Sequence, residues 1–254
     1  MEAMPGASES ILRCDERGAV AVLTLNRPAR RNAFNDQQYD DVRTALADAA
    51  ADDRTRVVVI TGAPGAFSAG QDIDEMASGR AFTPFVDELA AFDKPLLAAV
   101  NGVAVGVGLT MLLHCDIVYV GESARLRVPF VSLGLVCEAG SSLLLPLHIG
   151  PQRAAEVLFT GRWIGATEAV AAGLAVRVVA DNELVQTVLG AAAEIATQPP
   201  AAVRSMKQLL LAARADALSA ARAREDAAQM RRLGSPETVA AIRAFQSKRR
   251  PPGH

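Results

Sequence analysis

Residues 96–120 read LLAAVNGVAVGVGLTMLLHCDIVYV, and this stretch decides the fold class. Two short apolar runs, 96–100 and 116–120, lie on either side of a glycine-rich segment. Runs of this length and composition are typical of strands that are buried on both faces. The segment 96–113 approaches the length of a membrane span, but Asn101, Thr110 and several glycines interrupt it and charged residues flank it. We therefore interpret it as consecutive strands and a helix of an α/β domain.

The same alternation of strands and helices extends in both directions from this stretch. Alternating or apolar segments predict strands near residues 11–14 and over 19–26, 56–61 and 176–179. Helical spacing of apolar residues predicts helices over 36–52, with Asp36 as N-cap, and over 166–173 and 182–196. The alternation indicates an α/β core over residues 1–198.

A second region is expected to begin after the Pro199-Pro200 pair. Residues 201–233 predict one long helix rich in Ala, Arg and Leu, and Ser235-Pro236 predicts the start of another helix. These helices are too polar to form a core of their own. We expect residues 199–254 to pack on the main domain or on another subunit.

Composition excludes several classes of function. The chain has 254 residues, half of them apolar, with a net charge of −2 and a pI near 6.0, which argues against a broad nucleic-acid surface. Its three cysteines form no CxxC pair, so neither a disulfide framework nor a metal site is predicted. The first residues lack the apolar region of a signal peptide, and we expect a cytoplasmic protein with no membrane partner.

Three glycine-containing stretches carry the candidate chemistry. They are AFSAGQDI at 66–73, NGVAVGVGLTMLLHCD at 101–116 and LGLVCEAGSS at 133–142. The first two follow buried strands, so their loops are expected at strand ends, where α/β sheets bind ligands. Small residues leave backbone N–H groups accessible, and two such groups from separate loops would form an oxyanion hole. Each stretch taken alone is also compatible with a tight turn.

Other catalytic motifs fit poorly. The third position after Gly108 is Met111 instead of glycine, which disfavours a dinucleotide fingerprint. Ser68 lies in FSAG, not in the G-x-S-x-G pattern of a nucleophile elbow. His114 ends an apolar run and is expected in the core, and Cys137 has no histidine near it in sequence.

Six segments, taken in order and spacing, resemble the enoyl-CoA hydratase/isomerase (crotonase) family over nearly the whole chain. They are LNRPARRNAF (25–34), AFSAGQDIDEM (66–76), NGVAVGVGLTMLLHCDI (101–117), LGLVCEAGSS (133–142), FTGRWIGATEAVAAGL (159–174) and AFQSKRRP (244–251). The resemblance implies a crotonase-like spiral of ββα units followed by a C-terminal helical trimerisation region. It also implies a homotrimer or a dimer of trimers and an acyl-CoA thioester substrate, with coenzyme A as part of the substrate and no separate cofactor.

The resemblance implies an oxyanion hole made by the backbone N–H groups of Ala69 and Val107. The family usually has glycine at the second of these positions, so Val107 is a departure. The hydratases of the family carry two glutamates where this chain has Thr110 and Phe130. A carboxylate occurs instead at Glu138, the position of the single catalytic glutamate in the Δ3,Δ2-enoyl-CoA isomerases. The expected activity is therefore isomerisation of a 3-enoyl-CoA to a 2-enoyl-CoA.

Further substrate-binding positions follow from the same resemblance. They are Arg30 or Arg31 near the CoA phosphates, Phe245 and Lys248 near the nucleotide end, and Gln71, Asp72, Ile73 and Phe130 around the acyl group. Met76 and residues 77–92 are expected to line the acyl pocket. The charged residues are also compatible with solvated surface positions, Asp72 with a structural role, and Glu138 with an acid that interacts with a helix dipole.

Two alternative functions remain open at this point. One is another crotonase-type reaction, either enoyl-CoA hydration or isomerisation of a ring-unsaturated acyl-CoA. The other is a non-catalytic acyl-CoA-binding subunit, which would fit Val107 and the missing pair of glutamates.

Overall fold

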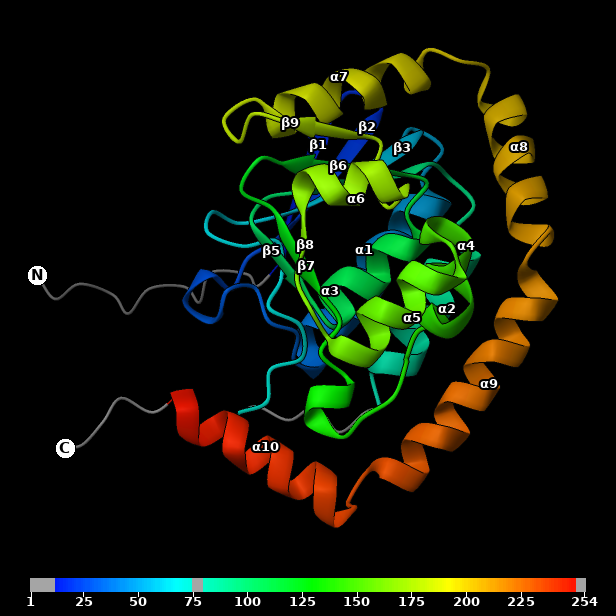
Figure 1. Ribbon diagram of the computed structural model, residues 1–254. Helices are drawn as coiled ribbons and strands as arrows, with labels where there is room; N and C mark the ends of the chain where they lie inside the picture. The colour runs from blue at the N-terminus through cyan, green and yellow to red at the C-terminus, as the bar shows by residue number, and fades with distance from the viewer. Residues whose placement is uncertain (1–11, 75–79, 250–254) are drawn as a thin grey trace, which may run out of the picture.

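A six-stranded sheet forms the centre of the molecule in the computed structural model, which describes residues 12–74 and 80–249 (Figure 1). Its strands, in spatial order, are β1 (Leu12–Arg17), β2 (Val20–Leu25), β3 (Val57–Gly62), β4 (Leu96–Val100), β6 (Ile117–Gly121) and β9 (Arg177–Val179). Only the hairpin between β1 and β2 is antiparallel, and the other neighbours are parallel. The predicted strands and the α/β class are confirmed within these bounds.

Both faces of the central strands are covered, which explains why β3 and β4 are buried along their whole length. On β3, Val58 and Ile60 face a large core shared with helices α1 (Asp36–Ala51) and α2 (Phe82–Ala91). Val57 and Val59 face a second, smaller core under α7 (Leu184–Ala196). A strand buried on both sides shows no polar alternation, as the sequence predicts.

A second, three-stranded sheet gives the chain its spiral course. It contains β5 (Val103–Val105), β7 (Arg125–Arg127) and β8 (Ile164–Gly165). Each of β4 and β6 passes directly into a strand of this second sheet, and β5 pairs in parallel with β7. Ser68, which follows β3, pairs in parallel with Ala104 of β5. Successive turns of the chain therefore stack in register, as expected for repeated ββα units.

Helices follow the turns of this spiral. The remaining ones in the core are the short η1 (Pro28–Arg30), α3 (Val107–Thr110), η2 (Met111–His114) and η3 (Val131–Leu133), with α4 (Ser141–Ile149), α5 (Pro151–Thr160) and α6 (Ala166–Ala172). The expected N-cap of α1 was wrong by one residue. The side chain of Asn35, not Asp36, accepts a hydrogen bond from the N–H of Gln38. Asn35 has the extended backbone of a cap, and Asp36 is already helical.

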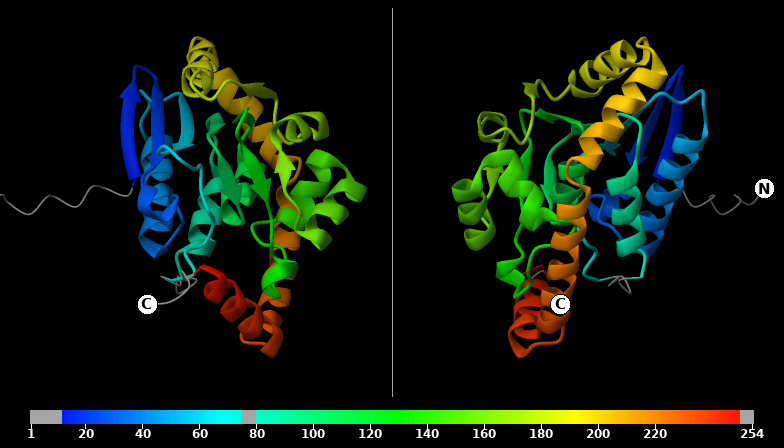
Figure 2. Two further views of the ribbon diagram at one scale, coloured as in Figure 1. Left: turned by 60° about the vertical axis from the view of Figure 1, so that its left-hand side comes forward. Right: turned by 90° about the vertical axis from the view of Figure 1, so that its right-hand side faces the viewer.

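The C-terminal segment runs along one side of the core and turns back beneath it (Figure 2). It consists of α8 (Pro200–Ala212), α9 (Ala215–Arg232) and α10 (Pro236–Arg249). The prediction of one helix over 201–233 was wrong, because the chain bends at Ala213 and Arg214 although no glycine or proline lies there. Tertiary packing explains the bend: Lys207 of α8 is fixed to Asp116 by bonds of 2.7 Å, whereas α9 packs against α4.

No helix among the described residues is long and apolar enough to cross a membrane. Residues 96–114 are divided instead between two strands and two short helical segments of the core.

Candidate active site

Two of the three glycine-containing loops interlock through their backbones. A Cβ added to Gly70 would lie 2.6 Å from the carbonyl oxygen of Val105, and one added to Gly108 would lie 2.8 Å from that of Ser68. Carbon and oxygen atoms do not approach so closely, so neither position accepts a larger residue without a shift of the backbone. These glycines bring the loop after β3 directly against the start of α3.

The N–H of Ala69 is not available to a ligand, which corrects the expectation from the resemblance. It donates to the carbonyl of Arg31 at 2.9 Å. The next residues pair with Phe34 on the same side: Phe34 donates to the Gly70 carbonyl, and Asp72 donates to the Phe34 carbonyl. In such a parallel bridge the N–H of the central residue points the opposite way.

The central residue of this bridge is Gln71, and its N–H takes the place expected for Ala69. No oxygen in the described part of the chain accepts a hydrogen bond from this N–H. It points away from Phe34, and on that opposite side of the segment Ser68 pairs with Ala104 of β5, the strand that leads into α3. The loop therefore offers a donor two residues later than expected, facing the start of α3.

Val107 offers the second backbone donor. It is the first residue of α3, whose N-terminal N–H groups have no partner within the helix. No acceptor for the Val107 N–H occurs in the described residues. The turn before it depends on Gly106, which has φ 54° and ψ −121°.

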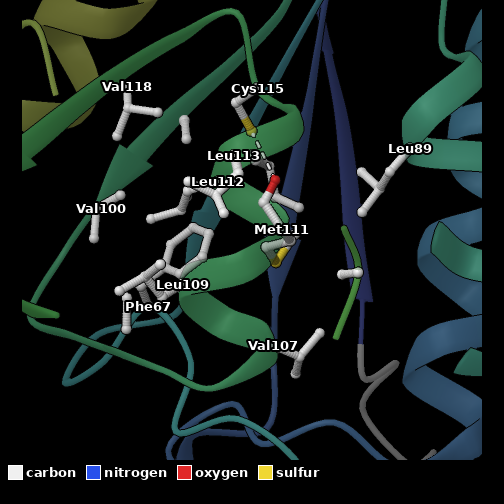
Figure 3. Packing of buried hydrophobic residues seen from close by; sticks show 14 of the residues in the cluster. Phe67, Leu89, Val100, Val107, Leu109, Met111, Leu112, Leu113, Cys115 and Val118 are labelled. Carbon is white, nitrogen blue, oxygen red and sulfur yellow. Dashed lines mark hydrogen bonds between the residues drawn. The ribbon is translucent and has the colours of Figure 1, made fainter. Parts of the chain in front are cut away.

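The departure from glycine at position 107 has a structural explanation. The Val107 side chain is 1% exposed and belongs to the large apolar core, along with Leu109, Met111 and Leu113 (Figure 3). Its φ angle is not positive, so the backbone carries no strain from the added side chain. The valine thus points inward and leaves its N–H at the helix start.

Glu138 lies in the third loop, directly before α4. Ala139 has a left-handed backbone (φ 56°), which is unusual for a residue other than glycine, and Gly140 follows with φ 77°. The ring Nε2 of His114 lies 2.8 Å from the Ala139 carbonyl oxygen. Ser141 closes the turn, with its hydroxyl donating to the Glu138 carbonyl at 2.6 Å. The loop conformation is therefore held by side chains on both sides of the helix start.

The carboxyl group of Glu138 is poised to exchange a proton near neutral pH. Burial, and then the negative charge of Glu225, raise its pKa from 4.5 to about 7. A carboxyl group with such a pKa can both accept and return a proton at the pH of the cell. His114 is unsuited to this role, because burial lowers its pKa to about 4 and keeps it neutral, in agreement with its expected place in the core.

Tyr39 of α1 connects Glu138 with the first loop. Its hydroxyl donates to the side-chain oxygen of Gln71 at 2.7 Å. Burial, then the charge of Glu138 and then that of Asp36, raise the pKa of Tyr39 well above its usual value. The hydroxyl group that bonds to Gln71 is therefore coupled electrostatically to the Glu138 carboxyl.

The two positions at which hydratases carry glutamates hold no acid here. Thr110 is fully buried, and its hydroxyl has no partner among the described residues. Phe130 is 6% exposed and packs in the large core. Of the residues at positions 110, 130 and 138, Glu138 is therefore the one that carries a carboxyl group.

Of the other predicted substrate-binding residues, some are buried in the protein and others lie on its surface. Asp72 is 4% exposed and pairs with Arg27 at 3.1 Å, so we correct its assignment from substrate-binding to structural. Arg30 is exposed and pairs with Asp74 at 3.0 Å, and Arg31 is also exposed. Ile73 is partly buried beside this loop. The assignment of Arg30, Arg31 and Ile73 to substrate binding stays a prediction.

The positions predicted for the nucleotide end lie on α10. Phe245 is 40% exposed there. Lys248 belongs to the same helix, but its side chain lies outside the described part of the structure, and Met76 lies outside it altogether. These assignments stay predictions.

Three residues of the site carry no sequence signal of their own. Tyr39, His114 and Glu225 reach the loops from α1, η2 and α9, and only tertiary structure brings them there. Within the described residues, no group of three or more His, Cys, Asp or Glu is arranged to hold a metal ion.

Comparisons with a family model, with known proteins and with solved structures all indicate the same family. Residues 15–252 match the family model described as enoyl-CoA hydratase/isomerase. The chain is 35% identical to 1,2-epoxyphenylacetyl-CoA isomerase of Escherichia coli, over 96% of this chain and 97% of that protein. It is 36% identical to 2,3-dehydroadipyl-CoA hydratase of the same organism, over 96% and 98%. A crystal structure of an enoyl-CoA hydratase/isomerase from Pseudoalteromonas atlantica superposes with a TM-score of 0.91 at 38% identity, over 96% of this chain and all of that one.

Proposed function

Because the chain belongs to the enoyl-CoA hydratase/isomerase family, we propose that it is an isomerase that moves the double bond of a 3-enoyl-CoA to the 2-position. Its relatives include both isomerases and hydratases, so family membership gives an enzyme acting on acyl-CoA but leaves the reaction open. One observation carries the choice of reaction. Glu138 has a pKa near 7, while the positions of the hydratase glutamates hold Thr110 and Phe130.

One carboxyl group is sufficient for this reaction. The Glu138 carboxylate takes a proton from C2 of the 3-enoyl thioester, and the electron pair of that C–H bond forms a dienolate whose charge lies on the thioester oxygen. The N–H groups of Gln71 and Val107 would stabilise that oxygen, as donors directed at developing charge do in other enzymes. Glu138 then gives the proton to C4, which leaves the double bond between C2 and C3.

Hydration needs a different arrangement. Adding water to a 2-enoyl thioester requires one group to deprotonate the water and another to protonate C2. Thr110 and Phe130 provide neither, since a buried threonine is a poor base and phenylalanine has no proton to exchange. The side chains of Phe130 and Leu143 are also apolar, so they offer a water molecule no hydrogen-bond partner.

The activity is tested by incubating the purified protein with 3-enoyl-CoA and following the absorbance of the conjugated product. We expect turnover in the wild type, and a loss of about 10²- to 10⁴-fold in kcat for Glu138→Gln. Binding of a saturated acyl-CoA serves as control and should change little. The same assay with 2-enoyl-CoA measures hydration as a loss of absorbance.

Two outcomes would contradict the proposal. Hydration faster than isomerisation would indicate a hydratase that uses another base. Tight acyl-CoA binding without turnover of 2- or 3-enoyl substrates would indicate a binding subunit.

A further inference from the structure

Three side chains on one face of α9 form hydrogen bonds with the backbone of the loop that contains Glu138. They belong to Glu225, Gln229 and Arg232, which are four and three positions apart and therefore lie on the same side of the helix. Their bonds to the loop backbone are Gly140 N–H and Ser142 N–H to Glu225 (both 2.7 Å), Val136 N–H to Gln229 (3.1 Å), and Arg232 Nε–H to the Gly134 carbonyl (3.1 Å). A segment far away in the sequence thus determines the backbone on both sides of Glu138.

Glu225 has a special place in this contact. Its carboxylate accepts two hydrogen bonds from the first N–H groups of the α4 start, and its side chain is buried, at 5% exposure. The helix lies so close that a Cβ on Gly140 would be 2.2 Å from the Leu218 side chain. A buried carboxylate in such a contact acts on its neighbours both through geometry and through charge.

We propose that Glu225 is a positioning residue for Glu138, which it serves through two bonds to the backbone of residues 140–142 and through its negative charge. The proposal rests on the proposed role of Glu138 as the proton-exchanging group. It makes the C-terminal region a part of the catalytic apparatus, in addition to any role in assembly.

The electrostatic part of this role follows from the groups that face Glu138. Tyr39 from α1 is neutral, because its pKa is raised well above the usual value by burial first and by Glu138 second. His114 from η2 is neutral as well, since burial lowers its pKa to about 4. Burial, and then the charge of Glu225, raise the pKa of the adjacent Cys137 to about 11, so this thiol is also uncharged.

Glu225 is consequently the nearby charge that shifts the titration of Glu138. It adds to burial in raising the pKa of Glu138 to about 7. A base with a lower pKa would remove the C2 proton less readily.

The first test is the pH dependence of kcat/KM for 3-enoyl-CoA in the wild type and in Glu225→Gln. Glutamine keeps one acceptor oxygen and removes the charge, so we expect the acidic limb of the profile to move to lower pH by about one unit. Asp226→Asn is the matched control, because it removes the same charge from the neighbouring, exposed position of α9 and should leave the limb in place. A purely structural Glu225 would lower the rate equally at every pH. An unshifted limb in a folded Glu225→Gln protein overturns the proposal.

A second measurement does not depend on turnover. The Glu138 carboxyl carbon is titrated by ¹³C NMR in both proteins, and its signal is assigned by its absence in Glu138→Gln. We expect a lower pKa for Glu138 in Glu225→Gln than in the wild type, and equal values would refute the electrostatic role. If the wild type fails to isomerise 3-enoyl-CoA but the NMR shift occurs, the proposed function is wrong while the coupling of the two residues stands.

Discussion

In the proposed mechanism, the chemistry of the site depends on a single side chain, Glu138, whose environment raises its pKa to about 7. Its carboxyl group is coupled to Glu225 and Tyr39, which belong to helices near opposite ends of the sequence. The environment that raises its pKa also opposes its ionisation in the folded state. Protonation of the Glu138 carboxyl group therefore affects both the proposed reaction and the stability of the fold.

This linkage predicts a pH-dependent effect of Glu138→Gln on stability. The native pKa of about 7 lies above the ordinary value of 4.5, so the folded state binds more protons between these values. The contribution of Glu138 is complete below about pH 4.5 and is lost as the pH rises through 7. Glutamine does not ionise, so above pH 8 the variant should be more stable than the wild type by up to about 3 kcal/mol.

Urea unfolding at about pH 4 and about pH 8.5 measures this difference. The gain should disappear at the lower pH, where the wild-type carboxyl is also neutral. A difference in the free energy of unfolding that is the same at both pH values would show that Glu138 does not titrate near neutrality.

The sequence motif and the scarcity of other suitable residues predict Glu138 as the base, and this role stays a prediction. One of the two expected backbone donors, Ala69, was wrong. Ala69 was a wrong choice since the direction of its N–H depends on Arg31 and Phe34, which form a bridge that no local pattern reveals. The roles of Glu225 and Tyr39 were likewise hidden, because they arise from contacts between distant segments.

The start of α3 is the element that most directly positions a backbone donor. Val107 lies at the first helical position, where proline is well tolerated because its fixed φ suits the helix and its N–H would be unpaired there. Val107→Pro therefore removes the donor while preserving the helix start.

We expect Val107→Pro to lower kcat for isomerisation by about 10²- to 10³-fold, the usual effect of losing one oxyanion donor. Val107→Ala keeps the N–H and loses only apolar contacts, so its kcat should stay within a few-fold of the wild type. Both variants are assayed with saturating 3-enoyl-CoA, and their melting temperatures are compared. Equal kcat values in the two variants would exclude the Val107 N–H as a donor.

Helices and strands could be predicted where the local sequence pattern determines them, but not where tertiary packing determines their ends. The strands of the central sheet and helices α1, α6 and α7 agree with the sequence to within a few residues. In β3 and β4, burial on both faces leaves unbroken apolar runs, and in the helices the local spacing and capping residues carry the signal. The bend between α8 and α9 could not be predicted, since residues 211–216 favour a continuous helix. The bend arises because Lys207 binds Asp116 while Leu218 and Glu225 pack near α4.

The outer face of α8 leads to a prediction for the whole molecule. Its exposed apolar side chains include Met206, Leu209 and Leu210, at 59%, 67% and 60% exposure. Burial of such a patch against other copies of the chain is favourable, and we expect a trimer or a dimer of trimers.

Light scattering on the purified protein gives the mass of the assembly. The double change Leu209→Ser and Leu210→Ser should shift the protein toward smaller species. Val176→Ser, which alters an exposed apolar residue near β9, is the control and should leave the mass unchanged. A wild type that is monomeric at micromolar concentration would refute the expected assembly.

The central claim is that one carboxyl group carries the proton from C2 to C4, and isotope transfer tests it most directly. A 3-enoyl-CoA with deuterium at C2 is converted in ordinary water in a single turnover, and the 2-enoyl product is analysed by mass spectrometry and NMR. A shuttle through the partly buried Glu138 predicts that a measurable fraction of the deuterium appears at C4. A product without deuterium at C4, in which the newly added hydrogen comes entirely from the solvent, would contradict the account.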